Sequence, residues 1–322
     1  MPTILLNLPP HAATENDLAR IREIMPGCEL RLTQDREEIA RLSQDVEILA
    51  GWPVTDLLVS APNLRWYQQW SAGSDWLLRH PEVAEGPLLV TNASGVHPVQ
   101  IAEHAFAMML AFTRKLHEAV RHQAAGKWQA PAGESLSELY EKTLLMIGLG
   151  AIGERIAQVG SALGMRVQGM RRRGGAPPPG VESIYPPERL LEILPECDFV
   201  VLAPPLTRET RGMIGEAALR AMKPTAFLVN VGRGKLIDEA ALICALREGR
   251  IAGAGLDVFE TEPLPAESPL WDMGNVIITA HYAGSSPRYY ERAMPIFLDN
   301  LRRYRDGMEL RNVVDKSEAL LG

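Results

Sequence analysis

Three side chains of the sequence have the chemistry of a proton-transfer and anion-binding site. Arg233, Glu262 and His281 each lie within a few residues of the end of an apolar, strand-like segment. A histidine exchanges protons near neutral pH, and a neighbouring carboxylate favours its protonated form and orients the ring. An arginine can bind a carboxylate through two parallel hydrogen bonds. Singly, the three are typical of an ion pair, a solvated loop acid and a capping histidine, whereas together they indicate a catalytic site.

The three residues meet only if the strands before them are parallel neighbours. Residues 97–285 alternate strand-like and helix-like segments, which predicts a parallel sheet covered by helices. Six strands are predicted, at Thr143–Ile147, Met165–Met170, Asp198–Ala203, Ala226–Val231, Gly253–Val258 and Asn275–Thr279. Helices are predicted at Ile152–Leu163, Glu188–Leu194, Gly215–Met222 and Glu239–Glu248. Ligands of such sheets bind beyond the carboxyl ends of the strands, so Arg233, Glu262 and His281 should share one rim.

The first of these strands runs into a G-x-G-x-x-G turn, formed by Gly148, Gly150 and Gly153. The first glycine permits a tight turn, the second lets the backbone approach a pyrophosphate, and the third lets the following helix pack closely. The helix N-terminus offers N–H groups and a positive dipole end to the phosphates. Because the motif lies between a strand and a helix, we predict a dinucleotide site rather than a glycine-rich turn without a ligand.

The residue after the second strand of this unit indicates which dinucleotide binds. An NAD-type site has an Asp or Glu there, which accepts a hydrogen bond from the ribose 2′-hydroxyl. This chain has Arg171, followed by Arg172 and Arg173, and residues 155–181 contain no Asp or Glu. Arginines can pair with a 2′-phosphate. We therefore predict that NADP(H) is preferred and that NAD(H) is the second choice; the alternative is a solvated basic loop.

The first 95 residues show the same α/β alternation. Strands are predicted at Thr3–Leu8, Glu29–Leu32, Val46–Ala50, Leu64–Gln68 and Leu88–Thr91, with helices at Asp17–Met25 and Arg36–Ser43. A strand-to-helix turn follows at residues 69–75, where exposed N–H groups would suit a carboxylate. The amphipathic segment Pro287–Tyr304 is predicted to be a helix that packs back onto this first domain.

One long helix is predicted from Pro98 through the segment that ends at Trp128. Its apolar stretch, Ala105–Phe112, must be covered from several sides, and a second copy of the chain would provide such cover. The helix carries three histidines, which we interpret as structural or solvated because no carboxylate stands at metal-ligand spacing: His104, His117 and His122. No metal site is expected.

Composition excludes several classes of partner. The 322 residues include 33 basic and 40 acidic side chains, a net charge of −7, which argues against nucleic acid or an anionic membrane as the main partner. The longest apolar run is too short to span a bilayer, and the N-terminus lacks the features of a signal peptide. The three cysteines are Cys28, Cys197 and Cys244; they are far apart and indicate reduced thiols in a cytoplasmic protein.

Several motifs from about Val96 onward resemble the D-2-hydroxyacid dehydrogenase family. They are GLGAIG, PPLTRETRGMI, LVNVGRGKLID, AGAGLDVFETEPLP, TAHYAGSS and FLDNLRRYRDG…RNVV, in the family's order; the first 95 residues match less closely, through ILAGWPVTDLL and SAGSD. The resemblance implies a Rossmann-type, doubly wound dinucleotide-binding domain (97–285) and a smaller, flavodoxin-like α/β substrate-binding domain (1–96 and 286–322). It also implies a small 2-keto acid substrate and a homodimer formed through the nucleotide domains.

Residue by residue, the resemblance makes Arg233 the substrate anchor, His281 the acid/base and Glu262 the partner of His281. Ala72 and Gly73 match the backbone turn that holds the substrate carboxylate. The expected cofactor-binding set comprises Gly148, Gly150, Ala151, Ile152, Gly153, Arg171, Arg172, Pro204, Pro205, Thr210, Val231, Gly232, Asp257, His281 and Gly284.

These residues suit reduction of a 2-keto acid, which needs a hydride at carbon and a proton at oxygen. The favoured function is an NADPH-dependent reductase for a substrate such as glyoxylate or hydroxypyruvate. Two alternatives stay open: an enzyme like 3-phosphoglycerate dehydrogenase, and a non-catalytic protein that senses NAD(H). Similar formate dehydrogenases have Gln where Glu262 stands, which disfavours that activity.

Overall fold

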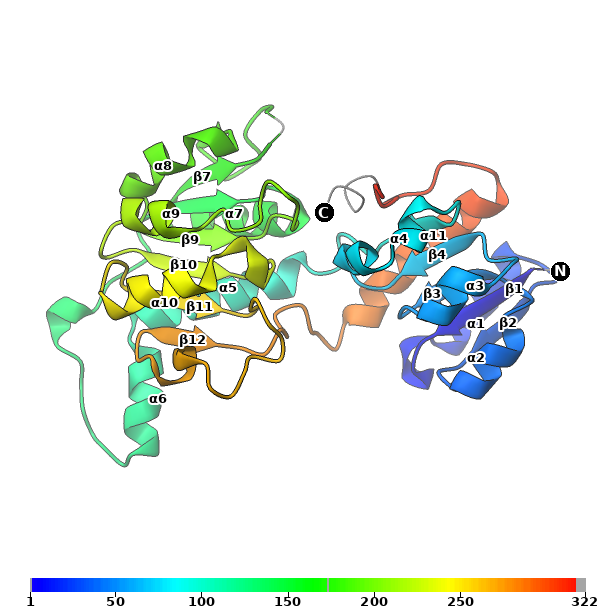
Figure 1. Cartoon of the computed structure of the whole chain (residues 1–322), viewed down its shortest axis with the longest axis horizontal. Helices are drawn as coiled ribbons and strands as arrows, with labels where there is room; N and C mark the ends of the chain where they lie inside the picture. Colours follow the sequence, from blue (N-terminus) through cyan, green and yellow to red (C-terminus); the bar gives the residue numbers. More distant parts are fainter. Residues whose placement is uncertain (1, 173, 317–322) are drawn as a thin grey trace. The chain divides into compact units, whose positions relative to one another are not determined.

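The structure is a computed structural model that describes residues 2–172 and 174–316. The chain divides into two compact units, which we call unit 1 (residues 1–97 and 286–322) and unit 2 (residues 98–285). Each unit has one parallel β-sheet with helices against it (Figure 1). The predicted fold class, α/β with two parallel sheets, is confirmed.

The sheet of unit 1 has the strand order β2-β1-β3-β4-β5, which is the flavodoxin-like order. Its strands are β1 (Thr3–Asn7), β2 (Glu29–Leu32), β3 (Val46–Gly51), β4 (Trp66–Gln69) and β5 (Leu89–Thr91). Its helices are α1 (Glu15–Ile24), α2 (Arg36–Leu42), α3 (Thr55–Ser60), α4 (Pro81–Glu85) and α11 (Tyr289–Arg305). All five residues of β1 are buried, as expected for a central strand covered on both faces.

Helix α11, near the C-terminal end of the chain, packs on the sheet of unit 1. Its apolar face, which includes Phe297 and Leu301, is fully buried in the same core as Trp66 of β4. The rings of Phe297 and Trp66 lie 5.7 Å apart. The buried amide of Asn300 donates to the side-chain oxygen of Gln68 at 3.0 Å. Burial of the aromatic residues thus holds the C-terminal helix on a sheet formed by the first 97 residues.

The sheet of unit 2 has the order β12-β11-β10-β9-β6-β7-β8, the Rossmann pattern in which the chain starts in the middle of the sheet. The strands are β6 (Thr143–Ile147), β7 (Arg166–Met170), β8 (Ser183–Tyr185), β9 (Phe199–Leu202), β10 (Phe227–Asn230), β11 (Gly253–Leu256) and β12 (Val276–Ile278). The prediction of six strands is wrong, because β8 adds a seventh at the edge. Its three residues are half-buried and include no apolar run, so the sequence carries little signal for it.

The helices of unit 2 are α5 (Pro98–Thr113), α6 (Leu116–Ala124), α7 (Ala151–Ala162), α8 (Leu190–Ile193), α9 (Glu216–Ala221) and α10 (Glu239–Arg247). The prediction of one long helix from Pro98 to Trp128 is therefore wrong. Lys115 adopts a left-handed conformation, with φ of 55°, which ends α5 and starts α6 in a new direction. The carbonyl of Thr113 accepts from the N–H of Ser137 instead of from a further helical turn.

The apolar stretch of α5 is covered largely by its own unit. Phe106 and Met109 are buried in a core that also contains Leu144 of β6. Gly160 of α7 allows this approach, since a Cβ there would lie 3.0 Å from Leu144 and 3.5 Å from the ring of Phe106. A second copy of the chain is thus not needed to bury most of α5.

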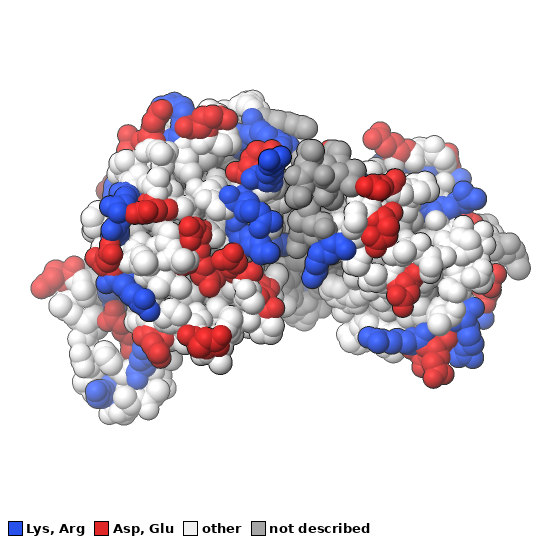
Figure 2. Space-filling model, in the orientation of Figure 1, with Lys and Arg blue, Asp and Glu red and all other residues white. Residues whose placement is uncertain are grey.

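The described surface carries both signs of charge. Lys and Arg side chains alternate with Asp and Glu over the face shown in Figure 2. Among the described helices, none combines the length and apolar character that a membrane crossing requires.

Candidate active site

Most of the predicted site residues lie in five loops that follow strands of unit 2. These loops follow β6, β9, β10, β11 and β12, which are consecutive neighbours in the sheet. Because all the strands are parallel, the five loops lie at one edge of the sheet, the edge where ligands of such folds bind.

His281 and Glu262 form a hydrogen-bonded pair in these loops. Nδ1 of His281 lies 2.6 Å from Oε2 of Glu262, and Oε1 of Glu262 accepts from the N–H of Phe259 at 2.9 Å. Both carboxylate oxygens are therefore engaged, which fixes the carboxylate and, through it, the imidazole ring. The side chain of His281 is 48% exposed, so Nε2, on the opposite side of the ring, is the nitrogen that can exchange a proton with a bound molecule.

The backbone of His281 is held by Asp257, which follows β11. The N–H of His281 donates to the Asp257 carbonyl at 2.8 Å. The Asp257 carboxylate is 2% exposed and accepts from the N–H groups of Tyr282, at 3.1 Å, and Ala283, at 3.0 Å. These bonds hold His281 at a φ of 53°, a conformation that residues other than glycine seldom adopt.

Arg233 lies in a turn that is fixed from inside the unit. The side chain of Asn230, fully buried at the end of β10, donates to the carbonyl of Arg233 at 2.9 Å and accepts from the N–H of Gly232 at 3.0 Å. Gly234 touches the backbone of Phe259 so closely that a Cβ would lie 1.8 Å from its carbonyl carbon. The Arg233 turn therefore lies against the segment that binds Glu262.

The three glycines of the G-x-G-x-x-G turn, which we call the fingerprint turn, have different surroundings. Gly148 adopts a φ of 93°, and a Cβ there would lie 2.5 Å from the nitrogen of Pro204, in the loop after β9. A Cβ on Gly153 would lie 2.0 Å from the Gly148 carbonyl oxygen. Gly150, the N-cap of α7, has open space within 4 Å of its Cβ position. Open space in front of a helix N-terminus suits a pyrophosphate.

The remaining predicted cofactor contacts lie around this turn. Ala151 and Ile152 form the first turn of α7. Thr210 donates to the carbonyl of Pro205 at 2.7 Å, which closes the loop after β9. Val231 and Gly232 are buried directly after β10, and the carbonyl of Gly284 accepts from Gln100 at 3.0 Å.

Arg171 follows β7 directly, and Arg172 is exposed beside it. Arg171 donates to the carbonyl of Ala176 at 3.1 Å. In the loop after β9, the pKa of the Glu209 carboxyl is lowered first by the hydroxyl of Thr207, then by a backbone hydrogen bond, and also by the charges of Arg172 and Arg208. Arg173, the third arginine of the predicted cluster, lies outside the described residues.

In unit 1, Ala72 and Gly73 lie in the turn after β4. The amide of Asn92 donates to the Ala72 carbonyl at 2.8 Å, and the amide of Gln69 donates to the Gly73 carbonyl. The N–H of Ala93 donates to the carbonyl of Ser71 at 3.1 Å. Side chains from two neighbouring segments thus fix the turn that the sequence analysis assigned to the substrate carboxylate.

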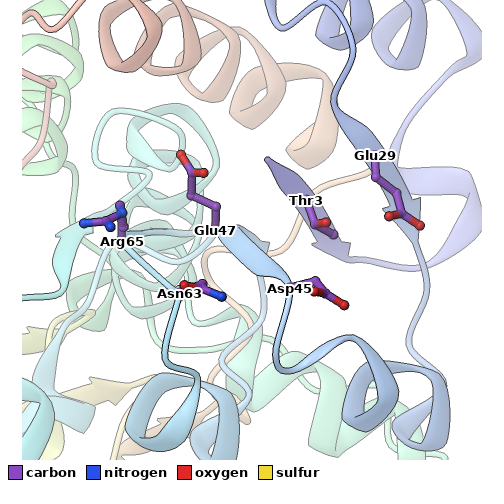
Figure 3. Close-up of a pocket in the computed structure, with 6 residues that line it drawn as sticks. All are labelled: Thr3, Glu29, Asp45, Glu47, Asn63 and Arg65. Atoms are coloured by element: carbon purple, nitrogen blue, oxygen red, sulfur yellow. The ribbon is translucent and has the colours of Figure 1, made fainter. Parts of the chain in front are cut away.

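A polar cavity of about 440 Å³ lies at the amino edge of the unit 1 sheet, opposite the edge that carries the Ala72–Gly73 turn (Figure 3). Its lining residues come from the starts of the strands: Thr3, Glu29, Asp45, Glu47, Asn63 and Arg65. None of the predicted site residues lines it. Parallel sheets bind ligands at their carboxyl edge, so we assign this cavity no part in the site. Among residues 2–172 and 174–316, no group of three or more His, Cys, Asp or Glu could hold a metal ion.

Sequence reasoning did not single out Asn230 and Thr279, and it treated His104 as structural or solvated without assigning it a partner. Thr279 donates to Oδ1 of Asp257 at 2.6 Å, and Nε2 of His104 lies 2.9 Å from the Thr279 hydroxyl. The available signal was positional: Asn230 and Thr279 are polar residues at the ends of strands, where side chains reach into the site edge.

Comparison with known proteins agrees with this geometry. Residues 106–283 match the D-isomer specific 2-hydroxyacid dehydrogenase, NAD binding domain. The chain is 39% identical to the glyoxylate reductase of Korarchaeum cryptofilum over 267 residues, which cover 81% of this chain and 79% of that protein. A solved D-isomer specific 2-hydroxyacid dehydrogenase family protein from Aeromonas salmonicida is 32% identical, with a TM-score of 0.84 over 98% of this chain and 99% of that one.

The NADPH-dependent glyoxylate/hydroxypyruvate reductase of Sinorhizobium meliloti, solved with NADP and sulfate, is 28% identical, with a TM-score of 0.83 over 99% of both chains. Fold and comparisons together define an oxidoreductase that uses a nicotinamide cofactor. The chain belongs to the D-isomer specific 2-hydroxyacid dehydrogenase family and is an NAD(P)-dependent dehydrogenase that interconverts 2-keto and 2-hydroxy acids. The family and reaction class predicted from the sequence are confirmed.

Proposed function

We propose that the protein is an NADPH-dependent reductase of a small 2-keto acid of the glyoxylate or hydroxypyruvate type. The observation that carries this proposal is the His281–Glu262 pair, held beside the Arg233 turn at the carboxyl edge of a Rossmann-type sheet. The relatives named glyoxylate reductase support the substrate class.

Each residue has a defined task in this reaction. NADPH supplies the hydride that adds to the keto carbon. Nε2 of His281 gives its proton to the keto oxygen, so that the keto acid becomes a hydroxy acid, and Glu262 holds the ring through Nδ1. The guanidinium of Arg233 binds the substrate carboxylate and polarises the keto oxygen. In unit 1, the backbone turn at Ala72 and Gly73 is proposed as a carboxylate-binding turn.

The fingerprint turn fits a dinucleotide, and two glycines test the fit. Gly150→Ala should leave the thermal midpoint unchanged, because the added Cβ meets open space, but it should weaken NADP(H) binding at least about tenfold because that space is proposed to hold phosphate. Gly153→Ala should instead destabilise the fold by about 1–3 kcal/mol, since its Cβ meets the Gly148 carbonyl. Calorimetry and cofactor titration separate the two effects. Equal NADP(H) affinity in wild type and Gly150→Ala would show that the phosphates lie elsewhere.

We propose a preference for NADP(H), supported by Arg171 and Arg172 at the ribose-reading position. Wild type should favour NADPH over NADH by at least about tenfold in kcat/KM, since 1.4 kcal/mol gives that factor. Arg171→Asp should abolish or reverse the preference, because a carboxylate repels the 2′-phosphate and accepts from a 2′-hydroxyl. Arg247→Asp, at an exposed position of α10, is the matched charge control. Equal kcat/KM for the two cofactors in wild type would show that the arginines point away from the ribose.

A turnover assay tests the proposed function and its alternatives together. Purified protein is mixed with NADPH and a panel of 2-keto acids that includes glyoxylate, hydroxypyruvate and 3-phosphohydroxypyruvate, and oxidation is followed at 340 nm. We expect the highest kcat/KM for glyoxylate or hydroxypyruvate. A preference for the phosphorylated acid would favour a 3-phosphoglycerate dehydrogenase-like enzyme. Cofactor binding without turnover of any acid would favour a non-catalytic sensor.

We propose a homodimer formed through the nucleotide domains. Helix α6 buries none of its own residues, and it exposes Leu116 and Val120; Trp128, beyond its end, is fully exposed. Such a surface on a monomer indicates a partner. Sedimentation should give a dimer, and Leu116→Glu with Val120→Glu should shift it toward monomer. A wild-type monomer at micromolar concentration would contradict the proposal.

A cytoplasmic location is proposed as well, because all three cysteines are free thiols.

A further inference from the structure

We propose that His104 and Thr279 are positioning residues that hold the segment carrying His281 in its catalytic geometry, through the buried carboxylate of Asp257. The inference rests on the proposed function in one respect, because it takes His281 as the residue that exchanges the substrate proton. It concerns residues of unit 2 alone.

One residue, Asp257, accepts hydrogen bonds from the backbone N–H groups of His281 and of the two residues after it. Asp257 uses its carbonyl for the N–H of His281 and its two carboxylate oxygens for Tyr282 and Ala283. A φ of 53° at a histidine is held by these surroundings and not by its own preference. A small rotation of the Asp257 carboxylate would therefore move the backbone from which the His281 ring projects.

The Asp257 carboxylate is in turn oriented by a chain of hydrogen bonds from Thr279 to His104 on α5, which we call the relay. The Thr279 hydroxyl donates its only proton to Oδ1 of Asp257 at 2.6 Å. The Thr279 oxygen can then only accept from Nε2 of His104, which lies 2.9 Å away. Burial lowers the pKa of His104, against a smaller opposing effect of the Asp257 charge, so the ring is neutral near neutral pH. Its single N–H is consequently placed on Nε2.

Helix α5 also holds the same segment at its far end. Gln100 donates to the carbonyl of Gly284 at 3.0 Å. Gln100 and His104 stand one helical turn apart and project from one face of α5. The helix therefore holds both ends of the segment, Thr279 and Gly284, with His281 between them. Because α5 is packed in the unit 2 core, it serves as a rigid support.

In metal sites, groups that hydrogen-bond to a ligating histidine fix the orientation of its ring, and their loss typically lowers metal affinity or activity by about 10–100-fold. The relay would act on His281 in a similar way. A purely structural network would instead lower stability without changing kcat in the molecules that remain folded. The two cases differ in what a hydroxyl-deleting change does to turnover at a temperature where the protein is folded.

The test compares Thr279→Val, which removes the hydroxyl and keeps the shape, with Thr279→Ser, which keeps the hydroxyl. His104→Leu and His104→Gln form a second pair, since glutamine retains an N–H donor. Each variant is measured for kcat and KM with glyoxylate and NADPH, for thermal midpoint, and for amide hydrogen exchange at residues 281–283. We expect Thr279→Val to lower kcat about tenfold or more while the NADPH KM changes less than threefold. Exchange at the three amides should rise, and Thr279→Ser should restore both values to within about threefold of wild type.

Several outcomes would overturn the inference. They are unchanged kcat and amide exchange in folded Thr279→Val, a Thr279→Ser variant as damaged as Thr279→Val, and His104→Leu that matches wild type in both readouts. If Thr279→Val does not fold, the His104 pair decides, since that side chain lies at the end of the relay. A wild type that turns over no 2-keto acid would refute the proposed function instead, and the amide exchange would still test the relay.

Discussion

Replacement of His281 by alanine should lower kcat for keto-acid reduction by at least about 10²-fold, the usual contribution of a positioned general acid. The reason is geometric. Glu262 engages Nδ1 at 2.6 Å, so Nε2 is the nitrogen that faces a substrate oxygen, and alanine leaves no donor there. Cofactor affinity should change little, because the proposed phosphate and ribose contacts lie on other loops.

The measurement is steady-state turnover across pH 5–9 with NADPH saturating, together with a fluorescence titration of NADPH. His122→Ala, on α6, is the matched control for loss of a histidine away from the site and should behave like wild type. Glu262→Gln keeps a partner for Nδ1 without the charge and should have an intermediate kcat. A His281→Ala enzyme with nearly wild-type kcat throughout this pH range would remove His281 from the mechanism.

Apolar runs and glycine positions were enough to predict most of the sheet of unit 2 and the loops that carry its site. Buried parallel strands need continuous apolar segments, and such runs stand out in sequence at β6, β9 and β10. The order of the strands within the sheet was not predicted from the sequence and is given by the structure. Their places after strands put Glu262 and His281 on one rim, and the family resemblance implied that they pair. The structure joins them by a hydrogen bond across 19 residues of sequence.

Other features depend on contacts that no local pattern encodes. The break after α5 occurs at Lys115, with neither glycine nor proline to mark it, because Ser137 takes the last carbonyl of the helix. The contact of His104 with Thr279 spans 175 residues, and that of Gln100 with Gly284 spans 184. From the sequence, His104 was interpreted only as structural or solvated, with no partner assigned. In the structure, the segment after β12 supplies the partners of both side chains on α5.

The positive φ of His281 is a case of tertiary structure overriding local preference. Glycine adopts the left-handed region freely; asparagine, aspartate and histidine are enriched there but adopt it seldom, so one histidine does not predict it. Three hydrogen bonds to Asp257 hold the conformation. In this conformation Nδ1 of the imidazole is hydrogen-bonded to Glu262, while the side chain stays 48% exposed.

Arg233→Lys should raise KM for the keto acid and lower kcat together, with a loss of about 10²–10³-fold in kcat/KM, the range found when one preorganised donor to a developing oxyanion is removed. Lysine keeps the charge but loses the planar, two-point fork that can hold a carboxylate and a keto oxygen together. The turn itself should survive, because Asn230 and Gly234 fix it through backbone contacts that do not involve the Arg233 side chain.

The experiment varies glyoxylate at saturating NADPH and titrates NADPH separately, with Arg247→Lys on the exposed face of α10 as the matched control. The thermal midpoint should match wild type in both variants. A larger KM with unchanged kcat would mean that Arg233 binds the carboxylate equally in ground state and transition state and does not act on the keto oxygen. Wild-type behaviour in both constants would mean that a point charge is sufficient, and the two-point role of the guanidinium would then have to be abandoned.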